Sequence, residues 1–423
     1  MTKPLVGYLD PFFFEVVEEI RRDLRVLFGT ANPCTLAISG TGSAGMETAV
    51  SNFAGPGTKL GVFVSGFFAE RIAEMGRRHG AEVVRCEKPW GETFTEAEAA
   101  AFLERERPNL VAFVHAETST GALQNPRAIA GPAHAIGALV IADCVTSLGG
   151  VPIDVDASGI DIAYSCSQKG LSCPPGLSPF TASPKAVEAA RARGDNPVWY
   201  LDLKMLVDYY DAPHKYHHTA PISTFYALRE GLAAIMEEGA ANRFARHLKS
   251  HQEFVRRMEA MGLSMHVAEG QRIATLNTVR VPEGVNDLDV RKRLLADHCI
   301  EIAGGFGPLA GKIFRIGLMG PLATPENVEL FCSAFARCLN PDAAVPEPAP
   351  ASTAARKFSL TKTIEAAKLN PRTLRPLSPV KSSIPYGAIL EKLSKDRDMQ
   401  QFYYLGEPYQ CPSSEIDRAL EPV

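Results

Sequence analysis

The amino-acid sequence predicts an α/β fold with a mostly parallel sheet, followed by a smaller α+β domain. Short apolar runs alternate with helix-like segments between Cys34 and Cys166, and such alternation is typical of parallel sheets. Several runs are almost continuously apolar, as strands covered by helices on both faces must be. After about residue 225 this pattern changes to a long helical tract followed by isolated strands and helices.

Six apolar runs are the predicted strands of the sheet: CTLAIS (34–39), KLGVFVS (59–65), EVVRC (82–86), LVAFVHA (110–116), ALVIA (138–142) and DIAYSC (161–166). The predicted helices between them include AGMETAVSNFA (44–54), FAERIAEMGRRHG (68–80) and TEAEAAAFLERER (95–107). In the last of these helices, Thr95 and Glu98 have the spacing of a capping box, which indicates where the helix begins.

The second domain is predicted from a different set of patterns. A helical tract over 226–262 is followed by TLNTVRV (275–281, strand), LDVRKRLLADH (288–298, helix), KIFRIGL (312–318, strand) and PENVELFCSAFARCL (325–339, helix). Near the C-terminus, residues 387–405 form an amphipathic helix candidate. We therefore predict a large domain over 1–240, a small domain over 241–340, a Pro/Ala-rich linker over 341–355 and a tail over 356–423.

Composition excludes several classes of protein. The 423 residues are 46% hydrophobic and 22% charged, with a formal net charge of -4. These values are typical of globular proteins and exclude wholesale disorder or a collagen-like repeat. Because the net charge is slightly negative, no general attraction to nucleic acid or to anionic lipid is expected. No apolar run approaches the roughly 18 residues needed to span a bilayer, so we predict no membrane association.

The nine cysteines indicate a reducing compartment. They are scattered and form no C-x-x-C pair, so neither a disulfide framework nor a zinc site is predicted. The opening sequence MTKPLVGYLDPFFF lacks the features of a signal peptide, and the chain ends in Glu-Pro-Val instead of a Ser-Lys-Leu address. We expect a cytoplasmic location, with a peroxisomal or other organellar one left open.

The segment SGTGSAGME (39–47) is the first candidate site, because it joins a predicted strand to a predicted helix. Glycines let an anion approach the backbone closely, and the N–H groups at a helix N-terminus favour negative charge. The segment matches G-x-G-x-x-G, but the next strand ends at Ser65 and Gly66, without the acid that binds ribose. We therefore predict a cradle for one phosphate, and a Gly-rich turn without ligand is the alternative.

Asp143 and Lys169 are the other two candidates. Asp143 ends a buried strand at the edge where α/β sheets bind ligands, and a carboxylate among apolar residues needs a partner. Helix capping is the structural alternative for Asp143. Lys169 follows the next strand, before the Pro/Gly-rich turn LSCPPGLS. Partial desolvation there would favour the neutral, nucleophilic amine, although most lysines face solvent.

These three features together match the needs of one cofactor. Pyridoxal 5′-phosphate requires a lysine for its aldehyde, a carboxylate for its ring nitrogen and an anion site for its phosphate. The predicted phosphate cradle, Asp143 and Lys169 stand at three strand ends of one sheet.

Seven motifs also occur in the order found in a known family: SGTGSAGME, GFFAERIAEMG, HAETSTG, ADCVTSLGG, SCSQKGLSCPPG, KYHHT and GKIFRIGLMG. In this order the chain resembles class V aminotransferases of fold type I from about Pro4 to Cys338, and is most similar to their alanine–glyoxylate (serine–pyruvate) type. The resemblance implies pyridoxal 5′-phosphate as the cofactor. It also implies a large domain with a seven-stranded, mostly parallel sheet and a small C-terminal α+β domain.

The resemblance carries site roles onto matching positions. Lys169 resembles the lysine that bonds to the cofactor aldehyde, and Asp143 resembles the partner of the ring nitrogen. The triplet Thr41, Gly42 and Ser43 resembles the phosphate loop. The other implied roles are a further phosphate ligand (Gln168), the aromatic stacked on the ring (Phe68), the cover of the opposite ring face (Val145), contacts near the ring 3′-oxygen (Thr118 or Ser119) and the arginine for the substrate carboxylate (Arg315).

Two positions in KYHHT imply an oligomer. Tyr216 and Thr219 resemble residues that reach the phosphate of a neighbouring subunit, which implies a homodimer with shared active sites. The adjacent His217 and His218 are expected to point apart. His247 and His251 have i,i+4 spacing without the Glu of a zinc protease and are expected on a solvated helix face, so no metal site is predicted.

The reaction implied by the resemblance is transfer of an amino group from alanine or serine to glyoxylate in a ping-pong scheme, giving pyruvate or hydroxypyruvate and glycine. The partners would be small amino acids and 2-oxo acids, with an unknown partner considered for residues 356–423. Serine–glyoxylate and 2-aminoethylphosphonate aminotransferases are alternatives. A cysteine desulfurase ranks lower, because Phe68 stands where a histidine is typical. A non-catalytic, aminotransferase-like protein that docks through its tail is the alternative from another class.

Overall fold

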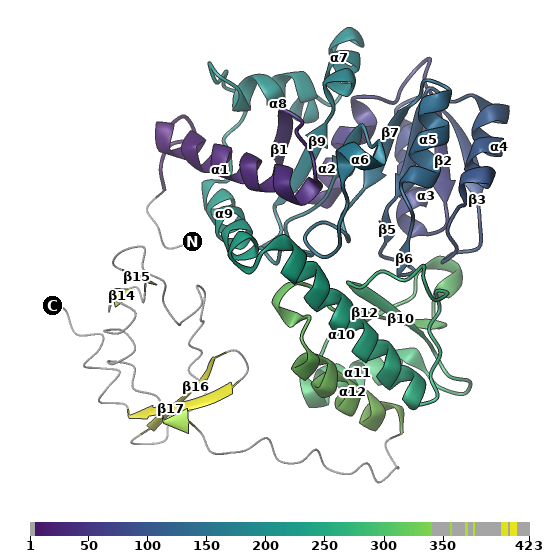
Figure 1. Cartoon of the computed structure of the whole chain (residues 1–423). Helices are drawn as coiled ribbons and strands as arrows, with labels where there is room; N and C mark the ends of the chain where they lie inside the picture. Colours follow the sequence, from purple (N-terminus) through teal and green to yellow (C-terminus); the bar gives the residue numbers. More distant parts are fainter. Residues whose placement is uncertain are drawn as a thin grey trace. The chain divides into compact units, whose positions relative to one another are not determined.

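The structure, a computed structural model, describes residues 5–340 and five short C-terminal strands (Figure 1). Contacts divide the chain into two compact units, Met1–Ala343 and Ala344–Val423. The predicted linker over 341–355 lies outside the described residues. No helix among the described residues is long and apolar enough to cross a membrane.

The first unit is built on one seven-stranded sheet. Its strands, in spatial order, are β1 (Cys34–Ser39), β9 (Leu177–Ala182), β8 (Ile162–Tyr164), β7 (Leu139–Asp143), β4 (Leu110–Val114), β2 (Lys59–Val64) and β3 (Glu82–Glu87). All pairs from β8 to β3 are parallel, so the prediction of a mostly parallel sheet is confirmed. The strand β9, antiparallel to β8 and β1, was not predicted. Its sequence LSPFTA contains Pro179 and follows a Pro/Gly-rich turn. Both features are unusual in strands, so the local pattern did not predict one.

Helices surround this sheet (Figure 1). Their bounds are α1 (Pro11–Phe28), α2 (Gly42–Ser51), α3 (Phe67–Arg78), α4 (Glu96–Glu106), α5 (Arg127–Ala135), α6 (Val155–Ser158), α7 (Pro184–Ala192) and α8 (Leu203–Tyr210). The predicted capping box is confirmed, because Glu98 N donates to the Thr95 hydroxyl and Thr95 N donates to the Glu98 carboxylate. Helix α1, absent from the prediction, packs against β1 and α9.

A second hydrophobic core lies in the C-terminal part of the same unit. It is formed by residues between Phe254 and Cys338, whereas the core of the large sheet contains buried residues from Phe13 to Ile235. The elements of this part are α9 (Ile222–Glu238), α10 (Ala240–Ala260), β10 (Leu276–Arg280), α11 (Asp287–His298), β11 (Ala303–Gly304), β12 (Ile313–Gly317) and α12 (Pro325–Leu339). Two cores agree with the predicted two domains, whose boundary at residue 240 stays a prediction.

The predicted helical tract over 226–262 is two helices. The chain bends at Gly239, which has a φ of 81° and separates α9 from α10. Glycine readily adopts a positive φ, so the residue type at position 239 explains why the helix is interrupted there. Helix α10 then packs against both α9 and α12.

The second unit, Ala344–Val423, contains short strands. They are β13 (Arg356–Lys357), β14 (Leu369–Asn370), β15 (Arg375–Pro376), β16 (Met399–Tyr404) and β17 (Glu407–Pro412), and β16 pairs antiparallel with β17. The predicted amphipathic helix over 387–405 is therefore wrong for residues 399–404. The sequence MQQFYY is rich in aromatic residues, which favour strands over helices.

We expect Gly45→Ala to destabilise the protein, because Gly45 lies where α2 packs against the sheet. A Cβ at Gly45 would collide with Ser178 Oγ and lie 3.2 Å from Tyr164 Cβ. The Ser178 hydroxyl cannot easily move, since it donates a hydrogen bond of 2.6 Å to Ser165 O. The free energy of unfolding, measured with urea, should fall by about 1–3 kcal/mol.

Gly131→Ala is the matched control for this measurement. A Cβ at Gly131, within α5, would meet no atom within 4 Å outside its own helix and its chain neighbours, so this variant should lose much less stability than Gly45→Ala. Equal stability of both variants would contradict the close packing inferred for α2.

Candidate active site

A cavity of about 810 Å³ opens where the carboxyl ends of the parallel strands face the C-terminal part of the first unit. Ligands of α/β sheets bind at this edge. Ten of the residues singled out from the sequence line the cavity: Thr41, Gly42, Ser43, Phe68, Thr118, Asp143, Val145, Gln168, Lys169 and Arg315. Ser119, Tyr216 and Thr219 are not among the lining residues.

The phosphate loop lies at the N-terminus of α2. Thr41 is the residue before the helix, and the side chains of Thr41 and Ser43 are exposed. A Cβ at Gly42 would lie 3.0 Å from Cys166 Cβ and 3.3 Å from Val145 Cγ2. Glycine at this position therefore lets the loop approach the segments that follow Asp143 and precede Lys169. The result is a helix N-terminus with two exposed hydroxyls, which suits an anion.

Asp143 is a buried carboxyl group at the end of β7, with 1% of its surface exposed. Its Oδ1 accepts a hydrogen bond of 2.9 Å from Val145 N, and its Oδ2 accepts one of 2.8 Å from the Tyr164 hydroxyl. Burial nevertheless raises the pKa of Asp143 to about 7. Two neutral donors do not replace the lost hydration, so a cation placed at this carboxylate would be strongly favoured.

Lys169 and Gln168 lie in the turn after β8. Gln168 is exposed and Lys169 is half-buried, and both side chains line the cavity. The turn is closed by a hydrogen bond of 2.9 Å from Ser172 N to Lys169 O. Strand β8 ends at Tyr164, whose hydroxyl donates to Asp143, and the turn after β8 carries Lys169. One segment therefore positions both Tyr164 and Lys169.

Phe68 is held by a buried carboxylate that the sequence analysis did not single out. Glu117 is 3% exposed, and its Oε2 accepts hydrogen bonds from Phe68 N (3.2 Å) and Ala69 N (3.4 Å) at the start of α3. Its Oε1 accepts a hydrogen bond of 2.6 Å from the Ser119 hydroxyl. Burial raises the pKa of Glu117, while these donors lower it. Glu117 thus stabilises the helix end that carries Phe68 into the cavity.

The structure separates the two candidates in HAETSTG. Thr118 lines the cavity and its hydroxyl contacts that of Thr146. Ser119 is fully buried, and its hydroxyl accepts a hydrogen bond of 2.9 Å from Phe67 N while donating to Glu117. Ser119 therefore contacts the start of α3 and is not part of the cavity wall.

Arg315 comes to the cavity from β12. Its Nε donates to Gly304 O (2.6 Å) and its Nη1 donates to Thr118 O (3.0 Å). The guanidinium carbon lies 4.1 Å from the centroid of the Phe306 ring. In the part of the chain that the structure describes, Nη2 has no hydrogen-bond acceptor, so the fixed guanidinium retains donors for a ligand carboxylate.

Tyr216 and Thr219 lie outside this cavity, and both are exposed. The expectation that His217 and His218 point apart is wrong, because their Nδ1 atoms are 2.8 Å apart. His218 Nε2 also lies 2.7 Å from Ser39 Oγ, directly before the phosphate loop. Burial lowers the pKa of His218 to about 4, so the pair is neutral and one ring can accept from the other.

The prediction that His247 and His251 lie on a solvated helix face is also wrong. Their exposed fractions are 0% and 8%, because α10 is covered on this side. The polar atoms are satisfied inside the protein: His247 Nδ1 lies 2.8 Å from Arg243 O, and His251 Nδ1 lies 2.6 Å from Asn277 Oδ1. Among the described residues, no group of three or more potential ligands could hold a metal ion.

Sequence reasoning missed four residues of the site: Glu117, Tyr164, Arg71 and Phe306. The first three lie inside the apolar runs or motifs, where the polar groups of Glu117 and Tyr164 are buried and could have served as a signal, whereas Arg71 is half-buried. Arg71 lines the cavity, with Nη1 3.4 Å from Ser43 Oγ and its guanidinium carbon 5.1 Å from the Phe68 ring centroid. Phe306 comes from a loop without a recognisable pattern.

The comparison with known proteins decides the family. The model of the family "Aminotransferase class-V" matches residues 11–330. The chain belongs to the class-V aminotransferases. It is 38% identical over 340 residues to an alanine–glyoxylate aminotransferase of Callithrix jacchus, covering 79% of this chain and 82% of that protein. It is also 35% identical over 347 residues to the (S)-ureidoglycine–glyoxylate transaminase of Bacillus subtilis, covering 78% and 83%.

Solved structures of this family are similar to the present one. The crystal structure of an alanine–glyoxylate aminotransferase from Nostoc sp. has a TM-score of 0.79 and 46% identity, covering 80% of this chain and 90% of that one. The predicted fold type I architecture, the membership in class V and the aminotransferase activity are thereby confirmed.

Class-V aminotransferases use pyridoxal 5′-phosphate, and the cavity of this aminotransferase fits that cofactor. The exposed hydroxyls of Thr41 and Ser43 at the N-terminus of α2 match a phosphate group. The buried carboxyl of Asp143 matches a protonated ring nitrogen, and Lys169 in the same cavity matches an aldehyde. The cofactor prediction is confirmed, whereas the role of each residue stays a prediction.

The raised pKa of Asp143 predicts a pH-dependent stability of the cofactor-free protein. The folded pKa of about 7 exceeds the usual 3.8, so ionisation costs more in the folded than in the unfolded state. The free energy of unfolding should therefore decrease as the pH rises from about 4 to about 7, by up to about 4 kcal/mol. Urea unfolding at several pH values would measure this slope.

Asp143→Asn should remove this contribution, and Asp289→Asn, at an exposed position, should retain it. An unchanged pH dependence in Asp143→Asn would contradict the assignment to this carboxyl.

Proposed function

We propose that this aminotransferase transfers an amino group from alanine or serine to glyoxylate, giving pyruvate or hydroxypyruvate and glycine. The observation that carries the proposal is one cavity that holds Lys169, Asp143 and Arg315 together. The names of the relatives from Callithrix jacchus and Nostoc sp. support glyoxylate as the acceptor.

The charges that line the cavity favour anionic ligands, such as the carboxylates of amino acids and 2-oxo acids. Lys169, Arg71, Arg291 and Arg315 line it, against the carboxyls of Asp143 and Glu301. Arg291 is already paired with Asp287, at 3.0 Å. We infer that Arg315 binds the substrate carboxylate with its remaining donors, because a planar guanidinium fixes both the position and the orientation of a carboxylate.

Binding of the cofactor would use the other residues of the cavity. Thr41, Gly42 and Ser43 would hold its phosphate with Gln168 as a further ligand, and Phe68 and Val145 would enclose the ring. When bound, pyridoxal 5′-phosphate supplies an electron sink that stabilises negative charge on the substrate Cα. Asp143 Oδ2 would keep a proton on the ring nitrogen, a task that its burial and its hydrogen bond with Tyr164 suit.

Lys169 would have two tasks at one atom. Its Nζ would bond to the cofactor aldehyde in the resting enzyme and, once displaced by the amino donor, would act as a base toward the Cα proton. The half-buried position of Lys169 in the cavity allows both tasks, because the amine is accessible to substrate yet partly shielded from water.

Other reactions receive less support. A cysteine desulfurase needs a reactive thiolate, but burial raises the pKa of Cys166, the cysteine in the cavity wall, to about 12. Serine–glyoxylate and 2-aminoethylphosphonate transfer remain alternatives within the same site. Ureidoglycine–glyoxylate transfer is a second candidate, since the Bacillus subtilis transaminase is 35% identical.

We also propose that the enzyme is a homodimer with shared active sites. Tyr216 is 58% exposed and Trp199 57%, close to the buried histidine pair, and the Tyr8 and Tyr216 ring centroids are 5.3 Å apart. Large exposed aromatic side chains of this kind are typical of a surface covered by a partner. Tyr216 and Thr219 would then reach the phosphate in the other subunit. A partner for residues 356–423 and a cytoplasmic location are further proposals, the latter supported by the free thiols of the described residues.

Lys169→Ala should abolish multiple turnover. Without the Nζ base, kcat for alanine and glyoxylate should fall by at least about a thousandfold, so that no more than one pyruvate per active site is formed during the assay. Lys185→Ala, at an exposed position on α7, is the control and should retain full activity. Multiple turnover by Lys169→Ala would contradict the proposed role.

The donor is tested on the wild-type enzyme by an absorbance titration with alanine, serine and (S)-ureidoglycine in turn, followed by glyoxylate. Alanine or serine should convert the bound cofactor to its aminated form, and glyoxylate should restore it. If only (S)-ureidoglycine reacts, the proposed donors are wrong.

Shared sites predict complementation between inactive variants. Tyr216→Ala and Lys169→Ala should each lose most activity, but co-expression should form mixed dimers with one intact site. Random pairing would restore about a quarter of the wild-type sites. Activity of the mixture no higher than the sum of the two variants would contradict a site built from two subunits.

A further inference from the structure

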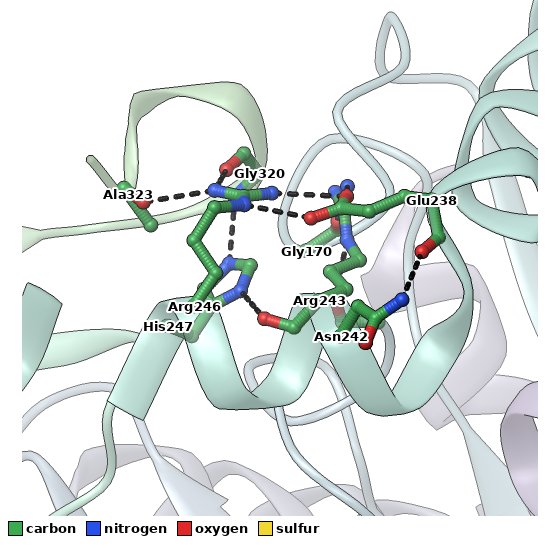
Figure 2. Close-up of polar contacts among 9 residues, drawn as sticks. Gly170, Glu238, Asn242, Arg243, Arg246, His247, Gly320 and Ala323 are labelled. Carbon is green, nitrogen blue, oxygen red and sulfur yellow. Dashed lines mark hydrogen bonds and ion pairs between the residues drawn. The ribbon is translucent and has the colours of Figure 1, made fainter. Parts of the chain in front are cut away.

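A cluster of polar residues around the bend between α9 and α10 joins the three segments that carry Asp143, Lys169 and Arg315. The cluster consists of Glu238, Arg243, Arg246 and His247 (Figure 2). None of these residues lines the cavity. Their contacts nevertheless end on the backbone of the segments that build it.

Arg243 binds the two segments of the large sheet. It is 4% exposed, and its Nη2 donates a hydrogen bond of 2.7 Å to Gly170 O, the residue after Lys169. Its Nε donates one of 2.8 Å to Gly149 O, in the ADCVTSLGG segment that begins beside Asp143. Gly149 and Gly170 are in close contact, since a Cβ at Gly170 would lie 3.1 Å from Gly149 C. The guanidinium therefore fixes the Lys169 turn against the Asp143 segment.

Arg246 and His247 bind the segment that follows β12. Arg246 Nη1 donates to Gly320 O (2.9 Å) and to Ala323 O (2.8 Å), three to six residues after the end of the strand that carries Arg315. His247 Nε2 accepts a hydrogen bond of 3.0 Å from Gly320 N. Both polar groups of Gly320 are thus held by neighbouring side chains of one helix.

Glu238 connects the two arginines. Its Oε2 lies 2.9 Å from Arg243 Nη1, and its Oε1 lies 2.7 Å from Arg246 Nε. The bend at Gly239 places this carboxylate, at the end of α9, beside the first turn of α10. All three nitrogens of the Arg243 guanidinium have acceptors, so its position is determined from three directions.

We propose that this cluster sets the position of Lys169 relative to Arg315. Arg243 positions the turn that carries Lys169, and Arg246 positions the segment after β12, the strand that carries Arg315. The inference rests on the proposed function, because it assumes that these two groups act on the amine and the carboxylate of one substrate. A small displacement between such groups is costly, since transfer requires the substrate Cα beside the lysine nitrogen.

The test compares Arg243→Gln, Arg246→Gln and Arg256→Gln. Arg256 lies on the same helix in a surface ion pair with Glu253 (2.7 Å) and serves as the matched control. Four quantities are measured for each variant: kcat, KM for alanine, the affinity for pyridoxal 5′-phosphate, and the rate at which an amine-directed reagent modifies Lys169 in the cofactor-free protein.

Arg243→Gln should change the reactivity of Lys169. We expect kcat to fall by about 100-fold, with weaker cofactor binding and an altered modification rate of Lys169, while KM changes little. Arg246→Gln should raise KM by about tenfold and leave cofactor binding and Lys169 modification unchanged. Arg256→Gln should match the wild type in all four quantities.

Equal effects of Arg243→Gln and Arg246→Gln on all four quantities would overturn the proposal, as would effects no larger than those of Arg256→Gln. If Arg243→Gln does not fold, Arg243→Lys takes its place, because lysine keeps the charge but cannot hold both carbonyls and Glu238. Modification of Lys169 in the cofactor-free protein does not depend on turnover. A wild-type enzyme without transamination would therefore disprove the proposed function, while this measurement would still decide the role of Arg243.

Discussion

The buried carboxyl group of Asp143 is the constraint around which this site is arranged. Two neutral donors, Tyr164 and Val145, are not sufficient to stabilise its charge, and its pKa is raised to about 7. A cation at that place would remove the penalty, and in the proposed function the ring nitrogen of pyridoxal 5′-phosphate supplies one. One sheet sets how far the predicted phosphate loop and Lys169 lie from Asp143. The three groups lie at or directly after the ends of β1, β8 and β7, which meet at the same edge. In the proposed function the acid that binds the cofactor is also one whose burial destabilises the cofactor-free protein.

Arg315, for which we propose substrate binding, comes from a different part of the fold than Asp143 and Lys169. Arg315 belongs to the three-stranded sheet of the C-terminal part, which has its own hydrophobic core. Hydrogen bonds to backbone carbonyls connect the two parts, from Arg315 to Thr118 and from Arg243 to Gly149 and Gly170. Such contacts depend on the path of the chain, which at Gly170 itself requires a glycine, because a Cβ there would lie 2.2 Å from Leu148 O.

Much of the fold could be predicted from local patterns. The strands β1, β2, β4 and β7 are continuous apolar runs, and α4 and α12 begin at recognisable caps, so short-range physics is sufficient for them. The strand β9 was missed because Pro179 and the preceding turn suppress the local signal, and its pairing with β8 and β1 is a long-range property. The segment over 399–404 was misassigned, because charged residues before it imitate a helical period.

Local sequence patterns were sufficient to single out residues 41–43, Asp143 and Lys169, because each lies at or directly after the end of a strand and the carboxyl ends of parallel strands meet at one edge. The order of the motifs was sufficient for the family. Which neighbours complete the site depends on how distant segments pack. Tyr164 reaches Asp143 because β7 and β8 are adjacent in the sheet, and Glu117 reaches the start of α3 across a loop. The burial of His247 and the contacts of Arg243 likewise arise from packing between elements far apart in the chain, where no local pattern carries the information.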